Sequence, residues 1–398
     1  MTKITAWIPF LLVIMLIYSG MHLYVFARAQ AAFHFNTRTG SVVAIFMILM
    51  VFSIIIGHVM ERAGSFFLAS LILHLGYIWL GLIFIFFFIS LLVDFYRLII
   101  YAGGLLPGLD ISFAVPSPKM IFFIPLTISI ILNIYGYYEG KNIRIEKVIV
   151  ATPKLPFEYN RLRIVQISDM HLGITTSEKR LRQIVTAVEK NEPDILVSTG
   201  DLVDSVTPST EHFLKPLKGI QAKYGKFAVT GNHEFYTDLD RALKFIKEAG
   251  FRILRGESVT VADIINIAGV DAPTAKHFGR ATGKPEKELL SNLPPTKFTL
   301  LLKHMPLINK KSLGYFDLQL SGHTHKGQIF PFGFITRLVY VSDAGLCDLP
   351  NNSRLYVSRG TGVWGPPIRV LAPPEITIID VVHKPGNRLK WQSSDKKK

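Results

Sequence analysis

The sequence predicts an all-α transmembrane bundle followed by an α/β domain. Hydrophobic residues make up 49% of the 398-residue chain, and its mean hydropathy of +0.33 is too high for an ordinary soluble enzyme. Residues 1–140 contain six basic and four acidic side chains, so the 38 basic and 25 acidic residues that follow carry +13 of the net charge of +15. Beyond residue 160, short β-branched segments bounded by turn residues alternate with a helical pattern, which is typical of an α/β domain.

Four stretches of the first part are apolar enough to form transmembrane helices. Residues 5–25, 40–60 and 120–138 each have about the length that a helix needs to cross roughly 30 Å of hydrocarbon. Residues 66–101 are longer, and residues 101–119, rich in Gly and Pro, predict a connecting or surface-lying segment. We therefore expect four spans, with five as the alternative. The first span lacks an Ala-x-Ala cleavage site, so it is expected to be an uncleaved anchor.

An even number of spans places the N-terminus and the α/β domain on the same side of the membrane. Five basic residues lie near the spans on that side and four on the other, so the positive-inside rule predicts a cytoplasmic domain. His58 and His74 lie within spans, where an ionisable side chain is a candidate contact for a lipid headgroup or a partner. The alternatives are that His58 lies at a hydrated span end and that His74 makes an interhelical hydrogen bond. In that case the four spans serve only to anchor the α/β domain.

These patterns divide the chain into four segments. We expect a membrane domain over 1–140, a linker and first strand over 141–156, the α/β domain over 157–383 and a basic disordered tail over 384–398. Such a short linker holds the α/β domain near the bilayer surface, where the effective concentration of headgroups is high. The single cysteine, Cys347, excludes an internal disulfide framework and is expected to be a small buried apolar residue.

Polar clusters end three predicted strands of the α/β domain. The strands cover 164–168, 195–199 and 227–230, and they are followed by Asp169-Met170-His171, Gly200-Asp201-Leu202-Val203-Asp204 and Gly231-Asn232-His233-Glu234. A helical pattern over 177–191 joins the first two strands, so these are parallel and their carboxyl ends lie on one side of the sheet. We therefore expect the three clusters to converge.

Two further clusters follow the same rule. Residues 298–302 precede Lys303-His304-Met305-Pro306, and residues 318–320 precede Ser321-Gly322-His323-Thr324-His325. A site of Asp, His and Asn side chains without cysteine suits a pair of divalent transition metals better than a structural zinc. One carboxylate can bridge two ions about 3.5–4 Å apart, which is the arrangement of two-metal phosphoester chemistry.

In this order the five motifs resemble those of the calcineurin-like metallophosphoesterase superfamily, over roughly residues 161–380. The resemblance implies a four-layer α/β/β/α sandwich, with two mixed sheets face to face and helices outside. It implies two divalent metal ions with these ligands: Asp169, His171 and His325 for one, Asn232, His304 and His323 for the other, and Asp201 as the bridge. It also implies His233 as the catalytic histidine and Asp204 as its orienting partner.

This ligand set predicts a mechanism without a covalent intermediate. Two ions sharing Asp201 would lower the pKa of a bridging water, and the resulting hydroxide would attack phosphorus in line. His233 would stabilise or protonate the leaving oxygen, with Asp204 fixing its tautomer. Mn, Fe and Zn all accept Asp, His and Asn ligands, so the metal identity stays open, with manganese as the test ion. Glu234 is expected to be a packing residue rather than a ligand.

The sequence also narrows the substrate. Ser205 and Val206 follow Asp204, where the phosphoprotein phosphatases of the superfamily usually have Arg and Gly, so protein dephosphorylation is not expected. The layout is similar instead to bacterial membrane-anchored metallophosphoesterases and to UDP-2,3-diacylglucosamine hydrolases of lipid A synthesis. The leading hypothesis is a metal-dependent phosphoric ester hydrolase, integral to the bacterial inner membrane, that cleaves a phosphodiester or pyrophosphate in a lipid or lipid precursor.

Two alternatives to this function stay open. One is an anchored nucleotide or cyclic-nucleotide phosphodiesterase, and the other is a non-catalytic metal-binding scaffold for a membrane partner. Nucleic acid is not an expected partner, because the basic residues are scattered and do not alternate with aromatic ones. The oligomeric state is left open.

Three later segments allow competing interpretations. Residues 275–295 are either a basic flap for phosphates or a solvated helix and loop. Residues 328–340 are rich in Phe around Pro331 and Gly333, and three interpretations are open. The segment is either buried beneath the site, or forms a wall for acyl chains, or dips into the membrane interface. Arg359 and Arg369 are either phosphate clamps or salt-bridged arginines. A helix over 238–250, a strand over 264–270 and closing strands over 356–362, 368–369 and 374–379 complete the expected elements.

Overall fold

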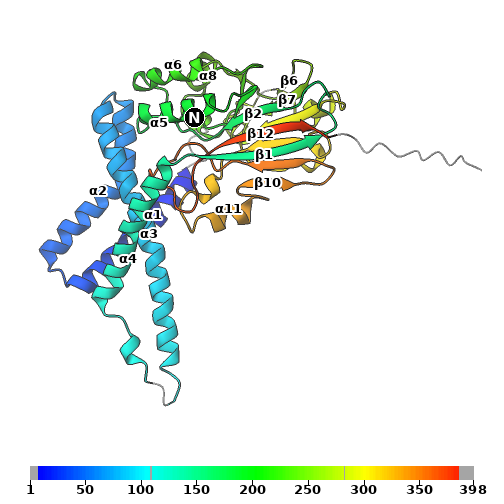
Figure 1. The fold of residues 1–398 in the computed structure, drawn as a ribbon. Helices are drawn as coiled ribbons and strands as arrows, with labels where there is room; N and C mark the ends of the chain where they lie inside the picture. The colour runs from blue at the N-terminus through cyan, green and yellow to red at the C-terminus, as the bar shows by residue number, and fades with distance from the viewer. Residues whose placement is uncertain (1–7, 108–109, 282, 385–398) are drawn as a thin grey trace, which may run out of the picture.

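The structure, a computed structural model, describes residues 8–107, 110–281 and 283–384. A group of long helices stands beside a domain of two β-sheets (Figure 1). The expected basic tail lies outside the described residues from 385 onward.

Four helices are long and apolar enough to cross a membrane. They are α1 (Ile8–Phe33), α2 (Thr37–Arg62), α3 (Phe66–Gly103) and α4 (Pro118–Lys141). Because α3 is one continuous helix of 38 residues, the five-span alternative is not seen in the described part of the chain. Between α3 and α4 lies a 3₁₀ turn, η1 (Ser112–Ala114). Aromatic and aliphatic side chains from all four helices pack together inside the bundle.

The first sheet has the strand order β1-β12-β2-β3-β4-β5. Its strands are β1 (Arg144–Thr152), β2 (Leu162–Ile167), β3 (Ile195–Ser198), β4 (Lys226–Ala228), β5 (Arg252–Ile253) and β12 (Glu375–His383). The pairing between β12 and β2 is antiparallel and the others are parallel. Since β1 pairs with β12 along its whole length and follows α4 after two residues, the α/β domain begins at the end of the last apolar helix.

The second sheet has the order β10-β11-β9-β8-β7-β6. Its strands are β6 (Glu257–Val261), β7 (Ile265–Val270), β8 (Phe298–Lys303), β9 (Leu318–Ser321), β10 (Gly345–Asp348) and β11 (Arg354–Val357). Strands β7, β8, β9 and β11 are parallel, and the outer strands β6 and β10 run antiparallel to their neighbours. Both sheets are therefore mixed.

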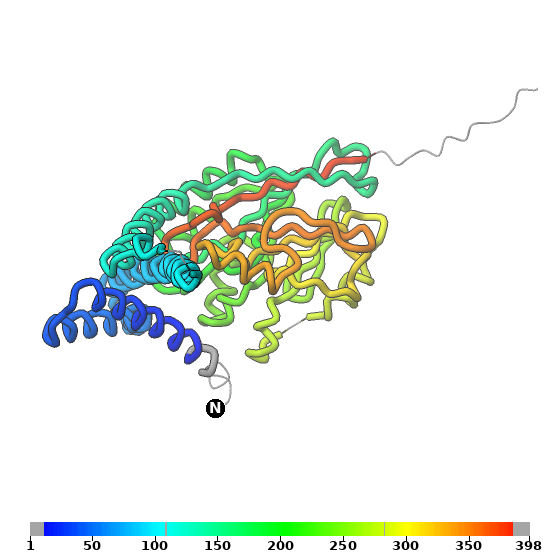
Figure 2. The backbone as a smooth tube through the Cα atoms, turned by 90° about the horizontal axis from the view of Figure 1, so that it is seen from below, coloured from blue at the N-terminus to red at the C-terminus, as the bar shows by residue number. Residues whose placement is uncertain are grey.

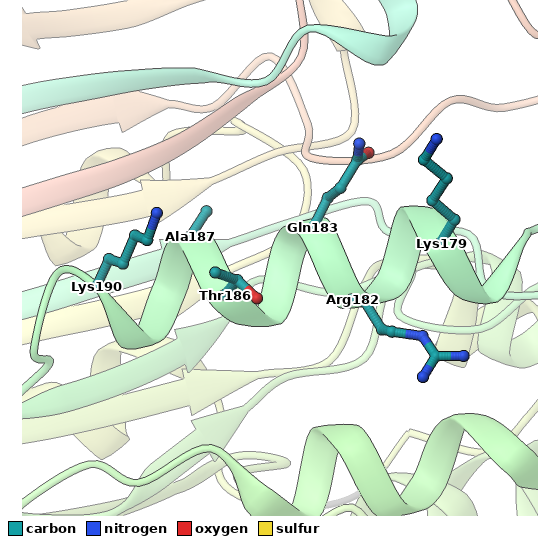
Figure 3. Close-up of a pocket in the computed structure, with 6 residues that line it drawn as sticks. All are labelled: Lys179, Arg182, Gln183, Thr186, Ala187 and Lys190. Atoms are coloured by element: carbon teal, nitrogen blue, oxygen red, sulfur yellow. The ribbon is translucent and has the colours of Figure 1, made fainter.

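Helices and sheets form the four expected layers. Apolar side chains from the facing surfaces of both sheets make one core. The other face of the first sheet is covered by α5 (Glu178–Glu189), α6 (Leu214–Gly219) and α8 (Leu239–Glu248), and the second sheet is covered by α10 (Glu286–Ser291). The outer side of α5 is basic and bears a surface pocket (Figure 3). This pocket is lined by Lys179, Arg182, Gln183, Thr186, Ala187 and Lys190.

Local signals locate the helices of this domain well. Ser177 caps α5 by accepting a hydrogen bond from the backbone N–H of Arg180, and Asp238 caps α8 in the same way. Gly250, with φ +88°, follows the C-cap Ala249 rather than forming the cap itself. The strand expected over 368–369 is wrong, because these two residues belong to no strand and only the next residue, Val370, makes an isolated bridge, to Ile329.

The α/β domain packs directly on α3 and α4. Ile85 of α3 forms a small apolar core with Ile329, Ile368 and Val370 of the domain. The backbone N–H of Arg369 donates to the carbonyl of Gly136 in α4 over 2.9 Å. In two perpendicular views the helices stand along one side of the sheets (Figure 1 and Figure 2). The two parts therefore share an interface in addition to the chain connection.

Candidate active site

Five strands from both sheets end at one place in the structure. Strands β2, β3 and β4 of the first sheet and β8 and β9 of the second precede all the predicted site residues. These strands are parallel within each sheet, so their carboxyl ends point to the same edge of the domain. The five polar clusters converge there, as the strand pattern predicted.

The first group of predicted metal ligands consists of Asp169, His171 and His325. One ligand atom from each lies within 4.8 Å of the others. The Nε2 atoms of His171 and His325 are 3.0 Å apart, and the Nε2 atom of His325 is 3.5 Å from a carboxylate oxygen of Asp169. All three residues are buried.

The second predicted set is Asn232, His304 and His323, and the ligand atoms of His304 and His323 lie within 4.8 Å of each other and of the predicted bridge, Asp201. The Nε2 atom of His304 is 3.1 Å from Asp201 Oδ2, 3.1 Å from Asn232 Oδ1 and 3.2 Å from His323 Nδ1. Asp201 additionally forms a close group with His171 and His233. It is thus the carboxylate that lies next to predicted ligands of both ions.

The backbone around these residues is held in an uncommon conformation. Five of the seven predicted ligands have left-handed backbone angles, with φ between 48° and 72°: Asp169, His171, Asp201, His323 and His325. Such a conformation costs about 1–3 kcal/mol per residue and persists only where the surrounding structure enforces it. Close packing also explains two motif glycines, because a Cβ at Gly231 or Gly322 would lie about 2 Å from a carboxylate oxygen of Asp201 or Asp169.

Hydrogen bonds orient two of the histidines. The Nδ1–H of His304 donates to the carbonyl of Thr199 over 2.8 Å, and that of His171 donates to Asp204 Oδ1 over 2.6 Å. Each bond leaves the Nε2 lone pair directed into the centre, where a metal ligand needs it. The His304 lone pair then faces acceptor oxygens of Asp201 and Asn232 at 3.1 Å.

This arrangement fits the two divalent metal ions that the resemblance implies. Acceptor atoms facing one another in a buried site repel unless a cation lies between them. Nitrogen and oxygen donors from His, Asp and Asn are suitable ligands for such an ion.

His233 lies at the edge of the centre. Its Nδ1 atom is 2.9 Å from Asp204 Oδ1, and its Nε2 atom is 4.0 Å from Asp201 Oδ2. Burial alone would lower the pKa of His233, but the charges of Asp201 and Asp204 outweigh this effect and raise the pKa to about 10. Burial alone would likewise raise the pKa of Asp204, whereas His171 and His233 together hold it well below its usual value.

Asp204 therefore contacts two histidines through the same carboxylate oxygen. The sequence interpretation paired it with His233 alone, but the same oxygen also accepts the hydrogen bond from His171. Asp204 couples the orientation of a predicted metal ligand to that of the predicted catalytic histidine.

Glu234 is a fully buried carboxylate that binds backbone rather than a metal. It accepts hydrogen bonds from the backbone N–H groups of Gly231 and Leu202 over 2.8 and 2.7 Å, and from those of Asp201 and Val203 over 3.2 and 3.3 Å. Burial and the nearby charge of Asp201 raise its pKa. It holds the loops after β3 and β4 together, which agrees with the packing role expected for it.

Three aromatic rings that the sequence interpretation did not single out border the site. Trp364 and Tyr236 pack against His233, with ring centres 5.7 and 5.4 Å away, and Tyr340 lies 5.8 Å from His323. Tyr236 is the last residue of helix α7 (His233–Tyr236), Tyr340 is the C-cap of helix α11 (Gly333–Val339), and Trp364 lies in a loop. No local pattern marks such residues, because only the fold brings them to the same place.

The apolar helices contribute a polar contact to the site edge. Ser205, the residue after Asp204, donates its hydroxyl to Glu61 Oε1 in α2 over 2.7 Å. The other oxygen of Glu61 is 3.2 Å from His58 Nδ1, and His58 Nε2 is 3.2 Å from the hydroxyl of Tyr77 in α3. His58 thus belongs to a network that reaches the site.

The other candidate residues of the sequence interpretation have structural contacts. His74 hydrogen-bonds the carbonyl of Ser70 in its own helix over 2.7 Å, so the expected interhelical bond is wrong. Arg359 is paired with Glu146 and Glu375. The guanidinium of Arg359 is therefore salt-bridged, as one of the two interpretations expected.

Arg369 lies fully buried beneath the centre. Its guanidinium donates to the carbonyls of His325 and Arg359 over 3.1 and 2.8 Å, and it lies 2.8 Å from His325 Nδ1. Burial lowers its pKa to about 9. It supports the loop of His325 and is not exposed as a phosphate clamp.

The expected basic flap consists of α9 (Thr274–His277), α10 and the chain between them. Arg280 pairs with Asp240, and Lys284 lies 4.0 Å from Glu288. These surface pairs agree with the solvated interpretation of this segment.

Comparisons with known proteins agree with this geometry. Residues 162–327 match the family model described as calcineurin-like phosphoesterase. An uncharacterized metallophosphoesterase of Aquifex aeolicus is 40% identical over 261 residues, which cover 65% of this chain and 99% of that protein.

Two other relatives have names that refer to a membrane or to a lipid precursor. A protein of Danio rerio named transmembrane protein with metallophosphoesterase domain is 32% identical, over 64% of this chain and 61% of that protein. The UDP-2,3-diacylglucosamine pyrophosphatase LpxG of Chlamydia muridarum is 27% identical, over 63% of this chain and 92% of that protein. With the four apolar helices, the transmembrane relative indicates membrane integration. The chain belongs to the calcineurin-like metallophosphoesterase family and is a metal-dependent phosphoester hydrolase.

Proposed function

We propose that the protein hydrolyses a phosphodiester or pyrophosphate bond in a membrane lipid or lipid precursor. One observation carries the proposal: the site lies against the apolar helices, because Ser205, next to Asp204, hydrogen-bonds Glu61 of α2. A substrate held in the bilayer can therefore reach the site without leaving the membrane surface. The relative named UDP-2,3-diacylglucosamine pyrophosphatase supports a lipid-linked pyrophosphate as the first substrate to test.

We propose the following residues as the ligands of the two ions, and their close contacts support the assignment. Asp169, His171 and His325 would bind one ion, Asn232, His304 and His323 the other, and Asp201 would contact both. When bound, the ions supply an activated water and offset charge on the phosphoryl oxygens. Arg369 keeps the His325 loop in position, and Glu234 does the same for Asp201.

His233 is the residue we assign to the leaving group. Asp204 accepts the Nδ1–H of His233, so the Nε2 atom is the one that can give a proton to the departing oxygen. Trp364 and Tyr236 pack on the His233 ring and restrict its rotation. This role requires the proton to sit on Nε2 when the phosphorus–oxygen bond breaks.

The substrate can be tested with detergent-purified protein supplied with Mn²⁺. We expect release of UMP from UDP-2,3-diacylglucosamine and faster cleavage of bis-p-nitrophenyl phosphate than of the monoester. If soluble nucleotides or cyclic nucleotides are cleaved faster than any lipid, the anchored nucleotide phosphodiesterase replaces this proposal. If no phosphoester is cleaved with two ions bound, and a His233→Asn variant complements a deletion strain, the scaffold alternative replaces it.

We also infer that the α/β domain faces the cytoplasm from a bacterial inner membrane. Lys141 is the last residue of α4, Arg144 and Lys147 lie in β1, and such basic residues next to a span are enriched on the cytoplasmic side. A fluorescent protein that matures in the cytoplasm should be active when fused to the C-terminus, whereas alkaline phosphatase should be inactive there. The opposite pair of results would reverse the orientation.

A further inference from the structure

One short helix of the α/β domain has its apolar side turned outward. Helix α11 (Gly333–Val339) contains Thr336 as its buried residue, whereas Leu338 is 87% exposed and Val339 63% exposed. Phe334 and Ile335 are also exposed. In α5 and α8, by contrast, the apolar residues are buried against the sheet. The polarity of α11 is thus reversed relative to a helix of a soluble domain.

The exposed surface extends beyond the helix on both sides. We call residues 330–341 the apolar ledge, and its exposed large residues are Phe330, Phe332, Phe334, Ile335, Leu338, Val339 and Val341. They are not buried beneath the site, so that interpretation of the sequence is wrong. So many adjacent apolar side chains are uncommon on a surface that faces only water.

The apolar ledge is continuous with the packing of the membrane helices. Ile329, the residue before it, packs on Ile85 of α3 together with Ile368 and Val370. The backbone N–H of Phe330 donates to the carbonyl of Val370 over 3.2 Å. In Figure 1, α11 lies on the underside of the domain, beside the point from which α3 continues downward.

The ledge is also fixed to the active site. Tyr340 packs on His323, and Arg337 Nε donates to Asp343 Oδ2 over 3.0 Å. The carbonyl of Asp343 in turn accepts a hydrogen bond from Thr324, between the two histidines of that motif. A displacement of the ledge would therefore shift the loop that carries the predicted metal ligands His323 and His325. Arg337 is itself the cationic residue that an interfacial segment needs to contact anionic headgroups.

We propose that the apolar ledge inserts into the boundary between headgroups and acyl chains of the bilayer that α1 to α4 cross. The occupant is lipid, because the ledge continues the surface by which the domain contacts a transmembrane helix. Insertion fixes the height of the active site above the bilayer, and the ledge then contacts lipid directly, in addition to the contacts of the domain with α2, α3 and α4. The proposal does not depend on which phosphoester the enzyme cleaves.

Fluorescence quenching in lipid nanodiscs tests this insertion. In a Cys347→Ser background, Leu338→Cys and Val341→Cys are labelled separately with an environment-sensitive fluorophore. The matched control is Phe157→Cys, an apolar position that is 82% exposed and packs on His383, the last residue of β12, at the far end of the domain from the helices. All these positions are at the surface, so the variants are expected to fold.

The ledge labels should be quenched by phosphatidylcholine carrying a doxyl group near the headgroup and protected several-fold from aqueous iodide. The Phe157→Cys label should show the reverse. If the ledge labels are as accessible to iodide as the control, the ledge lies in water and the proposal is wrong. If they are protected from iodide but not quenched by lipid, a second copy of the chain covers the ledge and the proposal is also wrong.

Discussion

Replacing Glu234 by Gln tests whether this carboxylate is the support of the metal centre. Four backbone N–H groups donate to its two oxygens, at 2.7 to 3.3 Å. A glutamine of the same shape keeps one oxygen, so two donors keep a partner and two face an NH₂ group. The change removes hydrogen-bond acceptors but keeps the side-chain volume. The measured loss of stability therefore reports the hydrogen bonds and not a change in packing.

The expected loss of stability follows from the two orphaned donors. A buried donor without a partner costs about 1–3 kcal/mol, so two cost about 2–6 kcal/mol. Removing the negative charge relieves repulsion from Asp201 and offsets part of this loss. We expect a net loss of about 3 kcal/mol, which lowers the midpoint of thermal unfolding of a domain this size by about 6–12 °C.

Thermal unfolding and metal binding are measured on the same detergent-purified samples. Because Glu234 holds the backbone N–H of Asp201, we also expect metal affinity to fall about 10–100-fold, measured by calorimetric titration of the metal-free protein. The control is Glu248→Gln on α8, where an exposed carboxylate lies 3.8 Å from Lys244, and we expect about 0.5 kcal/mol or less. A Glu234→Gln protein with unchanged midpoint and metal affinity would refute the reasoning.

Three further predictions concern the site, the membrane contact and pH. His233→Asn should lower kcat about 10²–10⁴-fold while two ions stay bound, as measured by metal analysis, because it removes the proton donor; loss of the metals instead would contradict the assignment. Glu61→Ala should lower kcat/KM about tenfold through the lost bond to Ser205. Ser205→Ala should do the same, and additive effects in the double variant would show that the two do not act together. Asp380→Asn should destabilise the protein at pH 7, because hydrogen bonds from Arg163 lower the pKa of Asp380 in the folded state. That stabilisation is present above the ordinary carboxyl pKa and is lost as pH falls through the lowered value, so the midpoints of wild type and variant should approach each other as the pH is taken below the ordinary carboxyl pKa; a constant difference would contradict it.

The sequence was informative wherever one short stretch determines its own structure. The hydropathy of a 20-residue window depends on no distant contact, so α2, α3 and α4 were located to within three residues at each end, whereas α1 extends eight residues beyond its predicted end. The same holds for the start of α8, which Asp238 caps within its own helix. The five motifs could be assigned to one centre because parallel strands must end on the same side of a sheet.

Short edge elements were not found in the sequence. Strands β5, β6 and β10 have two to five residues each, and their pattern is too brief to separate from a loop. They form strands because the backbone of an adjacent strand, β4, β7 or β11, provides hydrogen-bond partners. The residues bordering the site, such as Trp364, were missed for a similar reason, since a single aromatic side chain in a loop has no periodicity.

The sequence by itself thus determined which polar clusters meet at one edge of the domain and which helices are long and apolar enough to cross a bilayer, because strand ends and composition set these features. Only the tertiary structure decided which surfaces meet. Ser205 and Glu61 are 144 residues apart, and their contact exists because α2 packs beside the loop after β3. Likewise the composition of residues 330–341 fits a buried or an exposed segment equally well. Their exposure is decided by the position of α11 at the rim of the sheets beside α3, where no other described element covers it.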